Sequence, residues 1–395
     1  MPNEKTLNLN LKIKNKMEKF IAYNPVKLHF GKDVVNGLGK AASAYGKKVL
    51  FIYGKGSVKK YGYYDTVKKQ LADEGLEIIE FSGIKPNPLI EDARDAMNIG
   101  LDNKVDMIVA LGGGSVIDTA KMVGLGIANN TDPWLYMTHQ EQPTKNIPLL
   151  NVLTLAATGT EMNAAAVLQN HESGQKIGYV HPLSFPAESF LDPTFTISVP
   201  QDYTAYGIID LIAHSLEAYF GKGEPAVIDE ITFAIIKDAI NNGEKLLKHL
   251  DDYTLREAIM LDATLALNGL TVYGKFSGDW GVHSLGHEIS LLFDTAHGAT
   301  LSIAYPAWLK LHSNKIPDRI IKLGKALFGV HTVEDTIREL ENTFVRLQSP
   351  IRLSNINLGE KDATELLSQY NKNSVSGIHH QLSEKDYDKL VGFMR

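Results

Sequence analysis

The chain has 395 residues and a net charge of −6, and 44% of its residues are hydrophobic. A chain of this length favours two domains, because single cores stop growing at about 250–300 residues. The acidic balance provides no overall basic field, so we expect neither nucleic acid nor a membrane as a partner. The absence of cysteine excludes disulfides, thiolate nucleophiles and sulfur-based metal sites, so any metal must be held by nitrogen and oxygen.

The first sixteen residues, MPNEKTLNLNLKIKNK, alternate apolar and polar side chains and lack the continuous apolar core of a signal peptide. The chain also lacks an apolar run near the ~20 residues that cross a bilayer. We therefore expect a cytoplasmic protein. Met17 opens a segment typical of a natural start, so residues 1–16 are predicted to be an extension outside the fold.

Residues 48 to 129 predict alternating strands and helices. The runs KVLFIY from Lys48, LEIIEF from Leu76 and DMIVAL from Asp106 are typical of short buried strands. Helical spacing follows them over residues 58–75, 87–103 and 116–129. This alternation indicates a parallel sheet of the nucleotide-binding, Rossmann-like type.

Two glycine-rich turns in this region are candidate phosphate cradles. Gly112, Gly113, Gly114 and Ser115 lie between a strand and a helix, where backbone amides can face an anion. The turn matches neither GxxxxGK[ST] nor GxGxxG, and GKGSVK at Gly54 has Lys59 in place of the third glycine of the latter. Such turns are also common structural devices, so each one alone leaves a structural role open.

The sequence pattern changes at Pro200, from strand and turn signals before it to long helical patterns after it. The runs IPLLNVLTL and SFLDPTFTISVP carry strand and turn signals, and we expect them to complete an α/β domain over residues 17–200. Long apolar helical patterns then dominate, for example at 203–220, 228–250 and 252–270. We therefore predict an all-α domain over residues 201–395.

Candidate metal ligands lie in this second domain. Asp210 and His214 are four residues apart and share one helical face, although a hydrogen-bonded structural pair is an alternative for two such buried groups. His283, His287 and His297 lie together in GVHSLGHEISLLFDTAH. One carboxylate and several imidazoles suit a divalent cation. The peptidase motifs HExxH and HxxEH are absent, which disfavours a zinc peptidase.

Taken together, these motifs resemble the iron-dependent (group III) alcohol dehydrogenase family over nearly the whole chain from about Met17. The matching segments are FGK at Phe30, GIKPNP at Gly83, GGGSVIDTAK at Gly112, TLAATGTEMN at Thr154, DLIAHSLEAY at Asp210 and DWGVHSLGHE at Asp279. The last is similar to the butanol dehydrogenase and aldehyde reductase branch. The resemblance implies a dinucleotide-binding α/β domain and a helical metal-binding domain, with the cofactor and one Fe²⁺ or Zn²⁺ ion in the cleft between them.

The resemblance also implies roles for individual residues. The metal ligands fall on Asp210, His214, His283 and His297, which leaves His287 beside the ion as the proton carrier. The pyrophosphate-binding loop falls on residues 112–115, a second cofactor segment on Thr154, Thr158 and Asn163, and a ribose contact on Lys176. Asp118 falls on the nicotinamide side as a second catalytic candidate. Alternatively, Asp118 and Ser115 form a capping box that needs no ligand.

The nicotinamide cofactor is expected to be NADP(H). NAD-using members tend to have an aspartate at the end of the first strand, where its charge would repel a 2′-phosphate. This chain instead has Gly54, Lys55, Gly56 and Ser57 there, followed by Lys59 and Lys60, and this combination suits a phosphate. Glu80, at the end of the next strand, leaves a contact with a ribose hydroxyl open.

The resemblance implies reversible, metal-dependent reduction of small aldehydes to primary alcohols, and a homodimer. Trp280, beside the histidines, either lines the substrate pocket or lies in the core. Two alternatives stay open. One is another reaction on the same scaffold, such as an NAD-linked polyol dehydrogenase of the glycerol type or a dehydroquinate synthase. The other is a non-catalytic nucleotide-binding protein whose Asp and His residues are structural.

Overall fold

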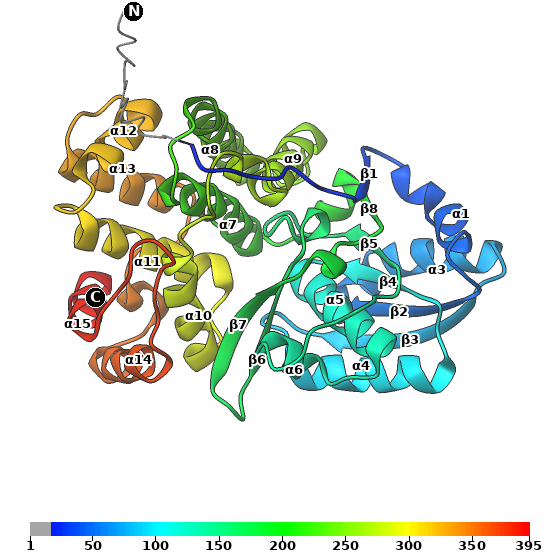
Figure 1. Cartoon of the computed structure of the whole chain (residues 1–395). Coiled ribbons are helices and arrows are strands. Elements are labelled where there is room, and N and C mark those ends of the chain that lie inside the picture. The colour runs from blue at the N-terminus through cyan, green and yellow to red at the C-terminus, as the bar shows by residue number, and fades with distance from the viewer. Residues whose placement is uncertain (1–16) are drawn as a thin grey trace, which may run out of the picture.

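A computed structural model describes residues 17–395, and the predicted extension at residues 1–16 lies outside the described residues. A six-stranded parallel sheet forms the first part of the chain, in the order β1-β8-β5-β4-β2-β3 (Figure 1). Its strands are β1 (Lys27–Phe30), β2 (Lys48–Gly54), β3 (Glu77–Ile84), β4 (Met107–Gly112), β5 (Leu149–Leu153) and β8 (Glu188–Leu191). This confirms the predicted parallel sheet.

Helices cover both faces of the sheet, because the central strands are apolar on both sides. In β2, Val49 and Phe51 pack into one core cluster with side chains of α1 and α3, whereas Leu50 and Ile52 pack into another with α4 and α5. The helices of this part are α1 (Leu38–Ser43), α2 (Ser57–Lys60), α3 (Tyr63–Asp73), α4 (Ile90–Asn103), α5 (Gly114–Asn129) and α6 (Pro133–Met137).

Two features of this part differ from the predicted elements. The helix expected over residues 58–75 is interrupted at Gly62, whose φ of 77° lies in the left-handed region that favours glycine, and it divides into α2 and α3. Strands β6 (Ala165–Asn170) and β7 (Gln175–Val180) form a separate antiparallel hairpin, which extends from the sheet toward α10 (Figure 1).

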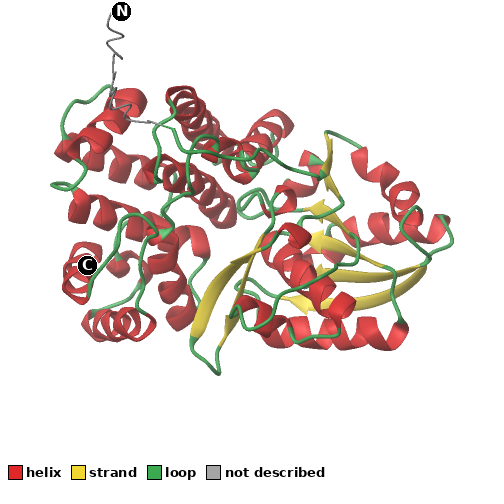
Figure 2. Ribbon diagram, viewed as in Figure 1, coloured by secondary structure: helices red, strands yellow, loops and turns green. Residues whose placement is uncertain are grey.

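The rest of the chain is helical, as predicted (Figure 2). Helix α7 is buried around most of its circumference and contributes to a single large core with its neighbours. Pro200 is its N-cap, and the division of the chain into domains at residues 17–200 and 201–395 stays a prediction. The helices are α7 (Gln201–Phe220), α8 (Ala226–Leu246), α9 (Tyr253–Leu267), α10 (Gly281–Phe293), α11 (His297–His312), α12 (Pro317–Phe328), α13 (Val333–Arg346), α14 (Glu360–Asn373) and α15 (Glu384–Met394).

Over residues 17–395 the structure contains no helix with the length and apolar character that spanning a membrane requires.

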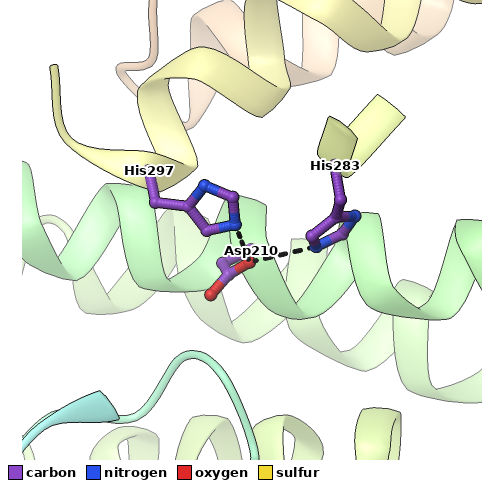
Figure 3. Close-up of side chains that lie close together, drawn as sticks. All are labelled: Asp210, His283 and His297. Carbon is purple, nitrogen blue, oxygen red and sulfur yellow. Dashed lines mark ion pairs between the residues drawn. The ribbon is translucent and has the colours of Figure 1, made fainter. Parts of the chain in front are cut away.

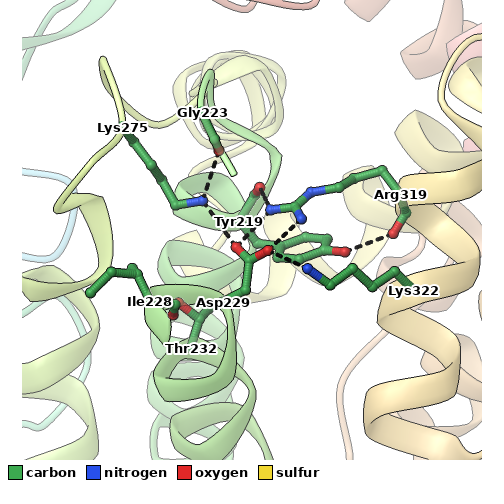
Figure 4. Close-up of polar contacts among 8 residues, drawn as sticks. All are labelled: Tyr219, Gly223, Ile228, Asp229, Thr232, Lys275, Arg319 and Lys322. Carbon is green, nitrogen blue, oxygen red and sulfur yellow. Dashed lines mark hydrogen bonds and ion pairs between the residues drawn. The ribbon is translucent and has the colours of Figure 1, made fainter. Parts of the chain in front are cut away.

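A buried ionic cluster ties α8 to α12 and to the segment before α10 (Figure 4). The Asp229 carboxylate accepts hydrogen bonds from Lys275 Nζ at 3.1 Å, Lys322 Nζ at 2.7 Å and both terminal nitrogens of Arg319 at 2.5 and 2.8 Å. Burial disfavours the charged carboxylate, but the hydrogen bonds from Arg319 and Lys322 outweigh it and lower the pKa of Asp229 to about 2.

We expect Asp229→Ala to lower the free energy of unfolding by about 3–5 kcal/mol, because it leaves the fully buried Lys275 ammonium without a counter charge. Urea unfolding followed by circular dichroism measures the loss. The stabilisation by Asp229 is complete above its unfolded pKa of about 4 and is lost as the pH falls toward about 2. Glu230→Ala, at an exposed position of α8, should change stability by less than about 0.5 kcal/mol. Equal losses in both variants would contradict the prediction.

Candidate functional site

A cavity of about 1400 Å³ lies between the carboxyl ends of the parallel strands and helices α7, α10 and α11. Ligands of open α/β sheets bind at this edge, because the loops that follow neighbouring strands meet there. Gly54 ends β2, Gly112 ends β4 and Thr154 follows β5, and all three line the cavity. One cavity therefore joins the glycine turns to the Asp and His residues of the helical part.

The structure brings together all but one of the predicted cofactor residues. Gly56 is not among the lining residues and instead forms the N-cap of α2. Its φ of −68° is open to any residue and a Cβ there would meet no atom within 4 Å, so packing does not require a glycine at this position. The predicted residues that line the cavity are Gly54, Lys55, Ser57, Gly112, Gly113, Gly114, Ser115, Asp118, Thr154, Thr158, Asn163 and Lys176.

The start of α5 can accept a phosphate. Within residues 17–395 no side chain caps this helix, so its first backbone N–H groups remain available to an anion at the cavity wall. A Cβ at Gly112 would collide with Val116, and one at Gly114 would lie 2.8 Å from Thr158 Oγ1. Packing within the protein therefore explains the glycines at 112 and 114, whether or not a ligand binds beside them.

The capping-box alternative for Asp118 is wrong, because the N-cap of α5 is Gly113 and Asp118 lies inside the helix. Its carboxylate accepts hydrogen bonds from Thr160 Oγ1 at 2.6 Å and from the Val167 backbone N–H at 2.9 Å. Burial raises its pKa. Asp118 thus joins α5 to β6 at the edge of the cavity.

Sequence reasoning missed Lys121, three residues further along the same helix. Its buried Nζ donates hydrogen bonds to Thr160 Oγ1 at 2.7 Å and to the carbonyls of Asn163 and Ala165 at 2.9 and 2.6 Å. The signal was a lysine directly before the apolar run MVGLGIA of the same predicted helix. Together with Asp118, it holds segment 160–167 against α5.

The cluster most suited to a metal consists of Asp210, His283 and His297 (Figure 3). One ligand atom from each lies within 4.8 Å of the others, and Nε2 of His283 and of His297 lie 3.7 and 3.8 Å from Asp210 Oδ1. Gly298 allows α11 to start this close to α7, because a Cβ there would collide with the Tyr206 carbonyl. The two helices are thus in backbone contact beside His297.

The polar atoms of this cluster fit a cation. Asp210 Oδ1 and His283 Nε2 are buried and have no hydrogen-bond partner within the described part of the chain. His283 Nδ1 hydrogen-bonds Glu217 Oε1 at 3.0 Å, which requires the Nδ1–H tautomer next to a carboxylate and turns the Nε2 lone pair toward Asp210. When the His283 ring is neutral, these two acceptors face each other without a donor, an arrangement that suits a bound cation in place of a proton.

The charge balance supports this fit. Burial disfavours protonation of His283, but the carboxylates of Asp210 and Glu217 outweigh it and raise its pKa to about 9. The field that attracts a proton to this position also attracts a metal ion.

The other two candidate histidines border the cluster. His214 lies outside the tight group, with Nδ1 3.6 Å from Asp210 Oδ1 and its ring centroid 4.6 Å from that of His283. Burial lowers its pKa to about 4, which leaves the neutral imidazole that metal ligation requires. The ring centroid of His287 lies 5.2 Å from that of His297. The structure therefore brings three of the four predicted ligands together and places His214 and His287 beside them.

Glu217, which sequence reasoning missed, orients one ligand of this cluster. It is buried on α7 and accepts hydrogen bonds from the backbone N–H of His283 at 3.0 Å and of Trp280 at 2.6 Å, in addition to the His283 ring. Carboxylates that hold a ligating histidine in this way fix its tautomer and strengthen its binding. The signal was its position, seven residues after Asp210 on the same helical face.

Comparison with known proteins identifies families that match both the α/β part and the helical part. The model of the iron-containing alcohol dehydrogenase family matches residues 25–193, and that of the C-terminal domain of the Fe-containing alcohol dehydrogenase family matches residues 204–388. The probable NADH-dependent butanol dehydrogenase 2 of Bacillus subtilis is 36% identical over 96% of this chain and 99% of its own. The NADPH-dependent aldehyde reductase of Escherichia coli is 32% identical over 93% of this chain and 97% of its own.

A crystal structure of NADH-dependent butanol dehydrogenase A from Thermotoga maritima superimposes with a TM-score of 0.92 at 33% identity, covering 96% of this chain and 99% of that one. The relatives thus include proteins named for each nicotinamide cofactor.

We expect the purified chain to bind about one divalent ion, and Asp210→Ala to bind it far more weakly, because the variant loses the one anionic ligand of the group. Glu217→Gln should weaken metal affinity about 10–100-fold, since it disturbs the orientation of His283. Elemental analysis and competition with a chelator measure both effects. Asp202→Asn, at an exposed position of α7, should leave the metal in place. Tight metal binding by Asp210→Ala would refute the assignment.

Proposed function

The chain belongs to the iron-containing alcohol dehydrogenase family, and we propose that it catalyses metal-dependent, NADP(H)-linked interconversion of small aldehydes and primary alcohols. Membership implies a nicotinamide cofactor and a metal, and the named relatives support oxidoreduction of alcohols and aldehydes. The observation that carries the proposal is the single cavity that connects the glycine turn at α5 to Asp210, His283 and His297.

We assign the metal to Asp210, His214, His283 and His297, with His214 completing the group from the adjacent turn of α7. When bound, Fe²⁺ or Zn²⁺ would polarise the carbonyl oxygen as a Lewis acid, and the nicotinamide would carry the hydride. These ligands do not select between the two ions. Asp118 and the residues at positions 112–115 would support the cofactor side of the cavity.

Apolar side chains in the wall of the cavity favour an aldehyde with an apolar tail. The Trp280 indole lines the cavity 5.3 Å from the His283 ring, between centroids, which supports the pocket interpretation over the core one. Leu267, Phe276 and Ile378 line the same cavity. Apolar walls bind a hydrocarbon chain without requiring further polar partners, unlike a polyol. The predicted homodimer and cytoplasmic location remain predictions.

His287 is proposed to move the proton. Burial, together with the positive charge of Lys176, lowers the pKa of His287 well below its ordinary value, so the ring is neutral near pH 7. A neutral imidazole holds a proton on one nitrogen and a lone pair on the other, so it can relay a proton between solvent and the substrate oxygen.

His287→Ala should lower turnover with an aldehyde by about 10²-fold or more and change its pH profile, because the relay is removed. Metal content should not change, since His287 lies outside the ligand set. Steady-state kinetics and elemental analysis test this. Ser284→Ala, a cavity-lining change on the same helix, serves as the control. Unchanged turnover and an unchanged pH profile in His287→Ala would rule out the role.

The proposal of NADP(H) rests on the charges at the end of β2. Lys55, Ser57 and Lys85 line this end of the cavity, and Gly54 brings no carboxylate. Two predicted contributors lack this support. Lys59 and Lys60 do not line the cavity, and the Lys59 ammonium lies over the Tyr64 ring, 4.6 Å from its centroid.

The alternative ribose contact at Glu80 is not supported. Glu80 accepts hydrogen bonds from Tyr53 Oη at 2.7 Å, Tyr64 Oη at 2.9 Å and Lys68 Nζ at 2.8 Å, and it does not line the cavity. Burial raises its pKa, but the bonds from Lys68 and the tyrosines outweigh this and lower it overall. The carboxylate is therefore engaged within the protein.

We expect a higher kcat/KM with NADPH than with NADH for a panel of aldehydes. Lys55→Ala should raise the KM for NADPH about tenfold and leave that for NADH nearly unchanged, because only NADPH carries the 2′-phosphate that the ammonium would bind. Lys60→Ala is the control. Equal or better rates with NADH would overturn the cofactor assignment, and no turnover with either cofactor would favour a non-catalytic binding protein.

A further inference from the structure

The β6–β7 hairpin lies between the sheet and helix α10 (Figure 1), and residues of both its strands line the cavity. On the sheet side, β6 is anchored by the bond from Val167 N–H to Asp118 and by the bond from Gln169 N–H to the Pro88 carbonyl at 2.9 Å. On the other side, β7 packs against α10, the helix that carries His283 and His287. The hairpin therefore contacts both the sheet side and the helical part.

The turn of this hairpin is bonded to the helical part by two side-chain amides, which a buried carboxylate holds in turn. The Gly174 carbonyl accepts hydrogen bonds from Gln369 Nε2 and Asn373 Nδ2, each at 3.1 Å. The same two amides donate to the Glu288 carboxylate at 2.9 and 3.0 Å. Glu288 is buried on α10, one residue after His287, whereas Gln369 and Asn373 lie on α14. We call Glu288, Gln369 and Asn373 the hairpin latch.

The latch acts close to a buried cation. Lys176 lies two residues after Gly174, and its Nζ donates a hydrogen bond to Asn87 Oδ1 at 2.8 Å. Asn87 Nδ2 in turn donates to Asp294 Oδ1 at 3.0 Å, at the C-cap of α10. Both Asn87 and Asp294 have left-handed backbones, with φ of 55° and 48°. The Lys176 side chain is thus held between the sheet loop and α10 at the wall of the cavity.

A carboxylate that orients two amide groups gives the latch a defined geometry. Glu288 has only acceptors, so each amide must present an N–H to it, and the second N–H is then directed at the Gly174 carbonyl. Charge-assisted bonds of this kind are about twice as strong as neutral ones. Glu288 has no role in the proposed reaction, although it is buried next to His287 in the chain.

We propose that Glu288, through Gln369 and Asn373, is a positioning residue that fixes the hairpin turn and so sets where Lys176 enters the cavity. The first step of this proposal is that the latch fixes the hairpin turn, and it is independent of the proposed function. The second step is that the turn positions Lys176 toward the cofactor, and it rests on the proposed function.

Hydrogen exchange of the cofactor-free protein tests the first step. Gln369→Leu keeps the side-chain volume but removes both bonds, and backbone amides at residues 171–180 should exchange at least tenfold faster, with no change in β4. Glu288→Gln, which leaves the α14 amides in place but removes the charge, should give a smaller change in the same segment. Asn371→Ala, at an exposed position of α14, should have no effect. Unchanged exchange at residues 171–180 in both latch variants would overturn the proposal.

A double-mutant cycle tests the second step. Gln369→Leu should raise the dissociation constant for NADPH, measured by its fluorescence, about fivefold in the wild-type background and less than twofold in Lys176→Met, because the latch acts through that lysine. Equal effects in both backgrounds would show that the latch does not act through Lys176. If the wild-type chain bound neither cofactor, the proposed function would fail, and hydrogen exchange would still decide whether the latch holds the hairpin.

Discussion

The arrangement of the helical part depends on two carboxylates buried in one apolar helix. Asp210 and Glu217 lie on the same face of α7, and each would be costly to bury without donors or a cation. Glu217 receives its donors from the first turn of α10, and Asp210 faces imidazoles from α10 and α11. The hydrogen bonds and ion pairs that these two carboxylates need hold α7, α10 and α11 together. The same contacts bring the candidate metal ligands into one place.

The cavity combines contributions that neither half of the chain supplies alone. The sheet brings glycine turns and unpaired backbone N–H groups at the start of α5, which suit an anion. The helices bring a carboxylate and imidazoles, which suit a cation. The hairpin and the loop containing Asn87 lie between the sheet and the helices. Lys176 of the hairpin donates a hydrogen bond to Asn87, and Asn87 donates one to Asp294 at the end of α10. A dinucleotide lying along the strand ends would therefore reach the metal cluster with its nicotinamide end.

Much of this could be predicted from the sequence, because local periodicity and local motifs carry it. The alternating strands and helices of residues 48–129 and the long helices after Pro200 are patterns within single elements. Asp210, His283 and His297 belong to recognisable motifs. Contacts between distant elements were not accessible in this way. Glu217 and Lys121 become informative only when α10 and segment 160–167 lie beside them. The contact of Lys59 with the Tyr64 ring likewise exists only in the folded chain.

The side chains that could hold the metal ion, Asp210, His283 and His297, come from three helices. Asp210 and His283 are separated by a long stretch of sequence that includes all of α8 and α9. An unfolded chain holds no such group, so an ion that binds here binds the native state almost exclusively. At a free metal concentration one hundred times the dissociation constant, this linkage adds about 2.7 kcal/mol to the stability of the native state. The ion would thus act as a cross-link in a protein that has no cysteine for a disulfide, and the supply of metal in the cell would govern how long the chain persists as well as how fast it turns over.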